Sequence, residues 1–305
     1  MRRSEAGVLL AISAAASFGI SGVLLKPMMT AGWSPTAVVI ARSVIASIIL
    51  AVPAALTLWG RWRVLRQGWV PIVAIGVVGV AVSQLSYAQA VRTLPIGTAI
   101  LIQYNAPVLL VIYGWVATRR PPRPSTIVGT VVALAGVFAV TVPTIDGALD
   151  LGGVLWACLA AVTVAAYYDA AARVPGTVPA LAAVTCGQII GAAFLLLAGI
   201  FGVSNIDMSV ADASLGGVVL PWWVPICTVG VVSTALGYCA SISASRRLGA
   251  RVASFFGLLE VIVAMLAAWI VLGEAPRPIQ SIGGCLVVVG VAVIGLQRPD
   301  RAATL

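Results

Sequence analysis

The chain contains no histidine, a single lysine (Lys26) and few charged residues of any kind, since Asp, Glu, Lys and Arg make up 9% of its 305 residues. Without histidine, HExxH zinc sites, Ser-His-Asp triads and histidine proton relays are excluded. The five cysteines stand singly with no CxxC pair, and no GxxxxGK[ST] phosphate-binding loop is present. We therefore expect no resident metal or cofactor, and no direct use of ATP by this chain.

Apolar residues dominate the composition, because hydrophobic residues account for 61% of the chain. They occur in runs of about 17 to 26 residues, each long enough to cross a bilayer as a helix with its backbone hydrogen bonds satisfied internally. The net charge of +9 comes mostly from arginines in the short gaps between these runs, so it reports membrane topology and we expect no nucleic-acid partner. We expect helices near 6–26, 35–58, 70–90, 97–117, 126–143, 151–172, 178–201, 218–243, 251–272 and 279–296.

Basic residues are distributed unevenly between alternate gaps. With the N-terminus in the cytoplasm, 14 basic residues lie on the inner side and 3 on the outer side, and Arg42 is left inside a run. Cytoplasmic loops of membrane proteins carry an excess of Lys and Arg. We therefore expect a multi-pass protein of the inner (plasma) membrane with both termini cytoplasmic.

The two halves of the chain are related in sequence. Leu94–Val137 aligns with Leu248–Val291 without a gap, at an offset of 154 residues. Because each half contains five runs, an odd number, the second half is inverted in the membrane. Inverted repeats of this kind build many secondary transporters, with the substrate site near the midplane. We expect an all-α integral membrane fold of ten helices, with one five-helix repeat in 1–146 and an inverted one in 147–305.

Four stretches carry a pattern of Gly, Pro and small residues that is similar to a known family. They are SYAQAVRTLPIGTAILIQYNAPVLLVIYGW, ASISASRRLGARVASFFGLLEVIVAMLAAWIVLGEAP, SFGISGVLLKP and IARSV. They resemble, in turn, the third-to-fourth helix passage, the eighth-to-ninth passage, the end of the first helix and the arginine-bearing second helix of the EamA-domain family, in the drug/metabolite transporter (DMT) superfamily. The resemblance covers nearly the whole chain and implies export or exchange of small metabolites, often amino acids.

The chain departs from the family pattern at one paired motif. The family often carries an acidic residue followed by Pro in the middle of its fourth and ninth helices. Here the fourth run keeps Pro107 after Ala106, and the ninth keeps Glu260 before Val261. Each half thus retains one member of the motif, so the two-fold symmetry is broken at this position.

Two charged residues lie deep inside apolar runs, where an ionised side chain is costly. Glu260 is near the middle of 251–272 and is a candidate for a proton-coupling or substrate-amine site. Alternatively, it makes a structural hydrogen bond or ion pair that fixes its helix. Arg42, inside 35–58, is a candidate for binding a substrate carboxylate, for pairing with Glu260 or for extending to the outer headgroups.

Polar residues elsewhere in the runs are further candidates. Gln103, Tyr104 and Asn105 interrupt 97–117, where they could line a water-filled cavity that orients a zwitterion or could hydrogen-bond between helices. Trp156 is a weaker cavity candidate for which helix packing is the alternative. Asp169 precedes Arg173 by four residues, so an (i, i+4) ion pair competes with a gate or proton site.

A secondary transporter that works by alternating access is the function these features favour. We expect export of a small metabolite, an amino acid or related zwitterion, and the alternative is efflux of drugs or cationic toxicants. An intramembrane enzyme is disfavoured, because a histidine base is absent, no DxxxD carboxylate pair lies within the apolar runs and Tyr168-Asp169 has no GxGD partner. The sequence leaves open the substrate, the direction of transport, coupling to protons and formation of a homodimer.

Overall fold

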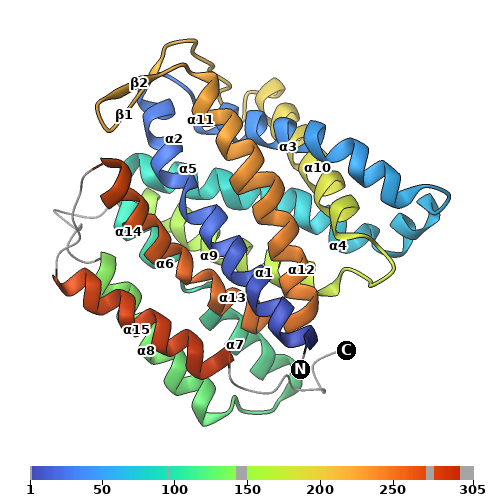
Figure 1. The fold of residues 1–305 in the computed structure, drawn as a ribbon, viewed down its shortest axis with the longest axis vertical. Helices are drawn as coiled ribbons and strands as arrows, with labels where there is room; N and C mark the ends of the chain where they lie inside the picture. The colour runs from blue at the N-terminus through green and yellow to red at the C-terminus, as the bar shows by residue number, and fades with distance from the viewer. Residues whose placement is uncertain (1, 95, 142–149, 273–277, 296–305) are drawn as a thin grey trace.

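The computed structural model describes residues 2–94, 96–141, 150–272 and 278–295, which are almost entirely helical (Figure 1). Seven of the described helices are long and apolar enough to cross a membrane, and three shorter apolar helices accompany them. Together they form the ten predicted spans, numbered here in chain order.

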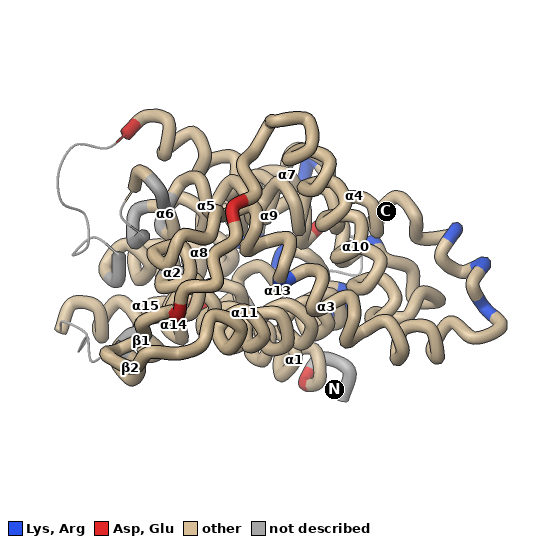
Figure 2. Tube along the Cα trace, turned by 90° about the horizontal axis from the view of Figure 1, so that it is seen from above, with Lys and Arg blue, Asp and Glu red and all other residues tan. Residues whose placement is uncertain are grey.

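The spans consist of the following elements: span 1, α1 (Arg2–Gly19) and α2 (Ser21–Thr30); span 2, α3 (Pro35–Leu58); span 3, α4 (Trp69–Ala74), η2 (Ile75–Val82) and α5 (Ser83–Thr93); span 4, α6 (Ile96–Gln103) and α7 (Ala106–Thr118); span 5, α8 (Pro124–Thr141); span 6, α9 (Leu151–Arg173); span 7, α10 (Ala180–Ile200); span 8, α11 (Trp223–Thr228), η4 (Val229–Leu236) and α12 (Gly237–Leu248); span 9, α13 (Ala250–Gly257) and α14 (Leu259–Leu272); span 10, α15 (Pro278–Gly295). A short 3-10 helix, η1 (Trp62–Gln67), joins α3 to α4, and basic residues gather there at one extremity of the trace (Figure 2).

Local sequence signals set several helix ends. The Ser34 hydroxyl caps α3 by accepting a hydrogen bond from the backbone N–H of Ala37, and Pro35 occupies the first helical position. The Asp150 carboxylate caps α9 in the same way at 2.7 Å from the N–H of Gly153. The proposed repeat boundary between residues 146 and 147 lies outside the described residues.

The backbone repeats with the offset that the sequence predicts. The elements α4, η2, α6, α8 and their counterparts α11, η4, α13, α15 begin 154 residues apart. Both η2 and η4 are π-helical, which is rare and concentrated at functional sites. The structural repeat therefore extends back to Trp69 and Trp223, before the aligned stretch.

Spans 4 and 9, predicted as single helices, are each interrupted near their middle. The interruptions lie at Tyr104–Asn105 and at Leu258, again 154 residues apart. Pro107 lacks a backbone donor and accounts for the first interruption. Span 9 has no proline there, and its chain tightens instead through i to i+3 bonds from Leu258 to Phe255 and from Val261 to Leu258. Discontinuous helices of this kind mark binding sites in transporters with inverted repeats.

The two repeats are interleaved in space. Span 1 packs against spans 8 and 9, and its counterpart, span 6, packs against spans 3 and 4. We name these groups the first bundle (spans 1, 8 and 9) and the second bundle (spans 3, 4 and 6). Spans 2 and 7 pack against each other and against η4 and η2, so they connect the two bundles.

Spans 5 and 10 form a close pair at one side of the molecule (Figure 1). A methyl group on Gly136 would lie 2.6 Å from the carbonyl oxygen of Gly283, and one on Gly290 would lie 2.5 Å from the backbone nitrogen of Ala133. Small residues permit this approach, as is usual where helices pack within lipid.

The segment 218–220, predicted as the start of the eighth helix, is instead a strand. β1 (Ala213–Leu215) and β2 (Val218–Leu220) pair antiparallel around Gly216 and Gly217, whose φ angles of 57° and 83° suit a tight hairpin turn. The helix therefore begins at Trp223 and extends to Leu248. We call the side of the bundle that carries β1 and β2 the hairpin end and the opposite side, where α1 begins, the N-terminal end (Figure 1).

Candidate functional site

The two interrupted helices meet at Glu260. This residue lies in the first turn of α14 and is partly buried, and its carboxylate is hydrogen-bonded by the side chain of Tyr104 at the interruption of span 4. Because Tyr104 belongs to the second bundle and Glu260 to the first, this hydrogen bond joins the two bundles. The sequence made both residues candidates for a cavity or for contacts between helices, and the structure brings the two side chains together.

Arg42 on α3 is held by a polar network and is only 3% exposed. Its Nε donates a hydrogen bond to the Thr234 hydroxyl of η4 at 2.8 Å, and its Nη1 donates to the Gln84 amide oxygen of α5 at 3.2 Å. The Gln84 nitrogen in turn donates to the Tyr238 hydroxyl of α12 at 3.3 Å. These hydrogen bonds fix the guanidinium where spans 2, 3 and 8 meet, so Arg42 does not extend to the headgroups.

Arg42 and Glu260 attract each other electrostatically without forming a direct ion pair. The hydroxyls of Tyr87, Tyr168 and Tyr238 also lie close enough to Glu260 to interact with its charge. The carboxylate of Glu260 thus interacts electrostatically with tyrosines from four different helices and with the fixed guanidinium of Arg42. We call this group, Arg42, Gln84, Tyr87, Tyr104, Tyr168, Thr234, Tyr238 and Glu260, the midplane site.

Both charges of the midplane site break the symmetry of the repeats. The position equivalent to Glu260 is Ala106, at the start of α7. Arg42 corresponds to Gly187, because the carbonyl oxygen of Arg42 lies against Gly230 as that of Gly187 lies against the equivalent Gly76. The scaffold is therefore two-fold, while the charge that a substrate could meet occurs once.

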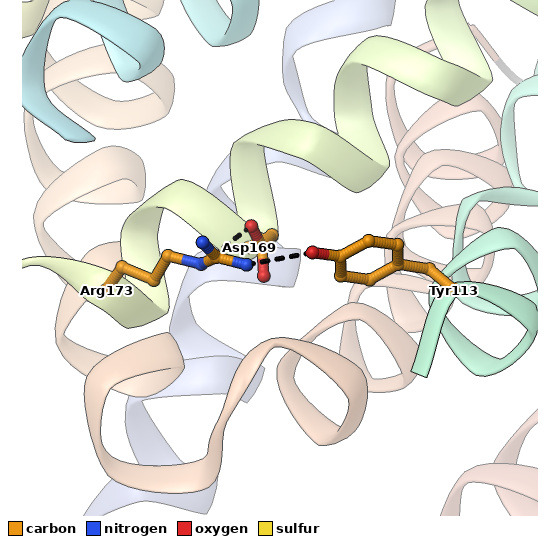
Figure 3. A network of polar contacts seen from close by, with 3 residues as sticks. All are labelled: Tyr113, Asp169 and Arg173. Atoms are coloured by element: carbon orange, nitrogen blue, oxygen red, sulfur yellow. Dashed lines mark hydrogen bonds and ion pairs between the residues drawn. The ribbon is translucent and has the colours of Figure 1, made fainter. Parts of the chain in front are cut away.

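The remaining predicted residues do not all join this group. Gln103 ends α6 and is partly buried, whereas Asn105 is exposed and its amide donates to the carbonyl of Ile102 at 3.1 Å. Asp169 pairs with Arg173 at 2.9 Å, with their side chains 32% and 55% exposed. Arg173 also donates to the Tyr113 hydroxyl at 3.0 Å (Figure 3). Because Tyr113 and Asp169 both belong to the second bundle, this contact does not link the bundles.

Two hollows open near the hairpin end, apart from the midplane site. One, of about 260 Å³, is lined by Gln89, Thr93, Asp150, Gly152, Gly153 and Trp156. The other, of about 190 Å³, shares Gln89 and includes Ser34 and Asn205. Trp156, 40% exposed, thus faces a peripheral hollow and has no contact with Glu260 among the described residues.

Thr234 and Tyr238 are members of the midplane site that the sequence analysis missed. Their positions correspond to Val80 and Gln84 at the offset of 154. Extending the repeat alignment by ten residues toward the N-terminus would have paired Gln84 with Tyr238. Neither residue stands out by itself, because a hydroxyl in an apolar helix can bond to its own backbone.

Comparison with known proteins assigns the chain to a family. Residues 5–142 and 151–296 each match the EamA-like transporter family. An uncharacterized transporter of Bacillus subtilis (strain 168), YwfM, is 25% identical over 242 residues, which cover 78% of each chain. A solved crystal structure superposes with a TM-score of 0.72 at 20% identity over 94% of this chain and 96% of the other, and so shares the fold. The protein, a multi-pass membrane protein with two copies of the family's helical repeat, therefore belongs to the EamA-like transporter family.

Proposed function

We propose that this transporter is a secondary active exporter of a small amine-bearing metabolite, an amino acid or related zwitterion, and that it works by alternating access. The observation that carries the proposal is the position of Glu260. A partly exposed carboxylate lies between the two bundles, at the point where both discontinuous helices are interrupted. Intramembrane carboxylates are costly and mark substrate or ion pathways.

Glu260 is suited to bind an ammonium group or a proton. Its hydrogen bond from Tyr104 leaves further lone pairs free, because a carboxylate has about four acceptor sites. The tyrosines that interact with Glu260 supply aromatic rings, which attract cations, and hydroxyls, which bind polar groups. Competition between the substrate amine and a proton for this carboxylate would couple export to the proton gradient.

Arg42 supports the binding of zwitterions by its charge alone. Its network with Thr234 and Gln84 holds the guanidinium in place, so we assign it a long-range attraction for the substrate carboxylate with no direct contact. The burial of Arg42 also favours a second candidate function, the efflux of cationic toxicants, because the less buried of the two charges at the midplane site is the negative one.

The distribution of arginines supports one orientation in the inner membrane. We propose that the N-terminal end faces the cytoplasm and the hairpin end faces outward, because cytoplasmic loops carry an excess of Lys and Arg. Reporter fusions at the two termini and in the hairpin at Gly217 would test this arrangement. Activity of a cytoplasmic reporter in the hairpin would contradict it.

Counterflow in proteoliposomes tests the function. Liposomes containing the purified protein would be loaded with one of a panel of amino acids or with a cationic dye. The Glu260→Gln variant would be compared with Asp169→Asn, a control in which a carboxylate is likewise replaced by its amide. We expect Glu260→Gln to lose about tenfold or more in flux, because a charge-assisted hydrogen bond contributes roughly 1.5–3 kcal/mol, while Asp169→Asn retains it. Full flux with an unchanged pH profile in Glu260→Gln would remove the carboxylate from the mechanism.

A further inference from the structure

Packing between the two bundles differs at the two ends of the molecule. Toward the N-terminal end, α12 and α13 of the first bundle pack against α9 of the second, and α13 packs against α7. The repeat-equivalent contacts toward the hairpin end would join α2 to α5 and α6, and α14 to α6. Within the described ranges none of these pairs packs as extensively as its counterpart at the N-terminal end. The bundles are therefore closed against each other at the N-terminal end and apart at the hairpin end.

A tyrosine facing a glycine lies at the centre of the closed contact. A methyl group on Gly257, at the end of α13, would lie 2.5 Å from the hydroxyl oxygen of Tyr168 on α9. Further toward the N-terminal end, a methyl group on Gly114 of α7 would lie 2.6 Å from Nη2 of Arg251 on α13. In both places a long side chain from one bundle covers a glycine of the other.

The inverted repeat identifies the counterpart of the Tyr168–Gly257 contact. Gly7 of α1 lies against Leu248 as Gly153 of α9 lies against the equivalent Leu94, so spans 1 and 6 correspond at an offset of 146 residues. A second contact agrees, because Gly19 lies against the carbonyl oxygen of Glu260 while its counterpart Ala165 packs with Ala106.

By these offsets Tyr168 corresponds to Gly22 and Gly257 corresponds to Gln103. The large and small partners are exchanged, since the glycine is now on span 1 and the long side chain is on span 4. Gly22 is exposed, and a methyl group there would meet no atom within 4 Å. Gly22, with open space beside it, thus occupies the position equivalent to Tyr168, which makes the closed contact with Gly257.

We propose that Tyr168 with Gly257 forms the cytoplasmic gate of this protein, closed here, and that Gly22 with Gln103 forms the matching outer gate, open here. In the opposite conformation Gln103 packs onto Gly22 and Tyr168 leaves Gly257. The proposal rests on the proposed alternating access and orientation. Tyr168 also positions Glu260 in this proposal, because its hydroxyl contacts Gly257, three residues before Glu260, and interacts with the Glu260 charge.

Disulfide formation between Gly22→Cys and Gln103→Cys tests the proposal in the full-length protein in membranes. Oxidation by copper phenanthroline would be quantified by mass spectrometry of the linked peptides. We expect slow linkage in the parent background and about a fivefold rise when Tyr168→Ala weakens the opposite gate, since loss of one contact shifts a two-state population by this order. Gly257→Ala is a second, milder variant, because its methyl group collides with the Tyr168 hydroxyl, and it should also raise the linkage. Adding Tyr168→Phe to Gly257→Ala removes that hydroxyl, makes room for the methyl group and should reverse the rise.

A matched control is Gly7→Cys with Leu248→Cys, which lie in contact within the first bundle and should link equally in every background. Rapid linkage of the 22–103 pair in the parent would show that the outer gate is already closed and would overturn the assignment. Linkage that stays slow in both gate variants, while the control pair links, would overturn it as well. Cross-linking measures the conformation of the protein and needs no substrate. A negative counterflow assay would therefore contradict the proposed substrates without contradicting the gate.

Discussion

The side-chain amide of Gln84 donates a hydrogen bond to the hydroxyl of Tyr238 at 3.3 Å, although the two residues occupy equivalent positions 154 residues apart. Contact between equivalent residues places them beside the pseudo-two-fold axis that relates the repeats. Gln84 also accepts from Arg42, so a residue beside the axis orients a charge that occurs once. The midplane site is thus a symmetric scaffold that carries two charges, Arg42 and Glu260, without counterparts in the other repeat.

Removing the Tyr238 hydroxyl should weaken this link measurably. Tyr238→Phe takes away the acceptor for the Gln84 amide, and the same hydroxyl donates to the Gly79 carbonyl at 3.4 Å. We expect a stability loss of about 1 kcal/mol, as is typical of hydrogen bonds between transmembrane helices. A double-mutant cycle with Gln84→Leu, followed by thermal unfolding in detergent, would measure the coupling, and strictly additive effects would contradict the link.

Lysine should not replace arginine at position 42. The guanidinium donates from two different nitrogens to Thr234 and to Gln84, and a lysine ammonium cannot reproduce this fork. We expect Arg42→Lys to lower the unfolding temperature and to reduce counterflow about tenfold, because leaving buried polar partners unpaired costs about 1–3 kcal/mol. Thr234→Val, which removes one partner, should have a smaller effect on both measurements, and equal effects would argue against the two-donor arrangement.

Bulk at the crossing of spans 5 and 10 should separate the two helices. A side chain at Gly290 would collide with the backbone of Ala133, which cannot yield as a flexible side chain could. We expect Gly290→Ala to reduce the folded yield, since overpacking typically costs about 1–3 kcal/mol. Gly284→Ala on the same helix is the matched control, because its methyl group would meet its nearest atom at an ordinary 3.7 Å. Similar yields for the two variants, by size-exclusion chromatography, would contradict the close crossing.

Asp169 should be dispensable for both transport and stability. Its ion pair with Arg173 is partly exposed and remains within the second bundle, as does the neighbouring contact of Arg173 with Tyr113 (Figure 3). Exposed pairs contribute about 0–1 kcal/mol. We expect Asp169→Asn to retain counterflow within about twofold of the parent rate, in line with that small energy. A severe loss of flux with unchanged folding would restore the gate or proton-site interpretation.

The sequence by itself determined the membrane class, the ten spans and the repeat. Long apolar runs must become helices in lipid because their backbone groups have no other partner. The offset of 154 residues could also be read directly, as could the uncharged Ala106 at the position equivalent to Glu260, since both depend on residue identity at fixed spacing.

Only the tertiary structure decided which helices are neighbours. The interleaving of spans 1, 8 and 9, the network from Arg42 to Tyr238 and the facing of Tyr168 with Gly257 join residues far apart in the chain. In a membrane the face that packs and the face that meets lipid are both apolar, so hydrophobic patterning does not distinguish them. Helices approach closely where small residues of two different helices face each other. This pairing depends on two segments at once and cannot be read from either segment alone.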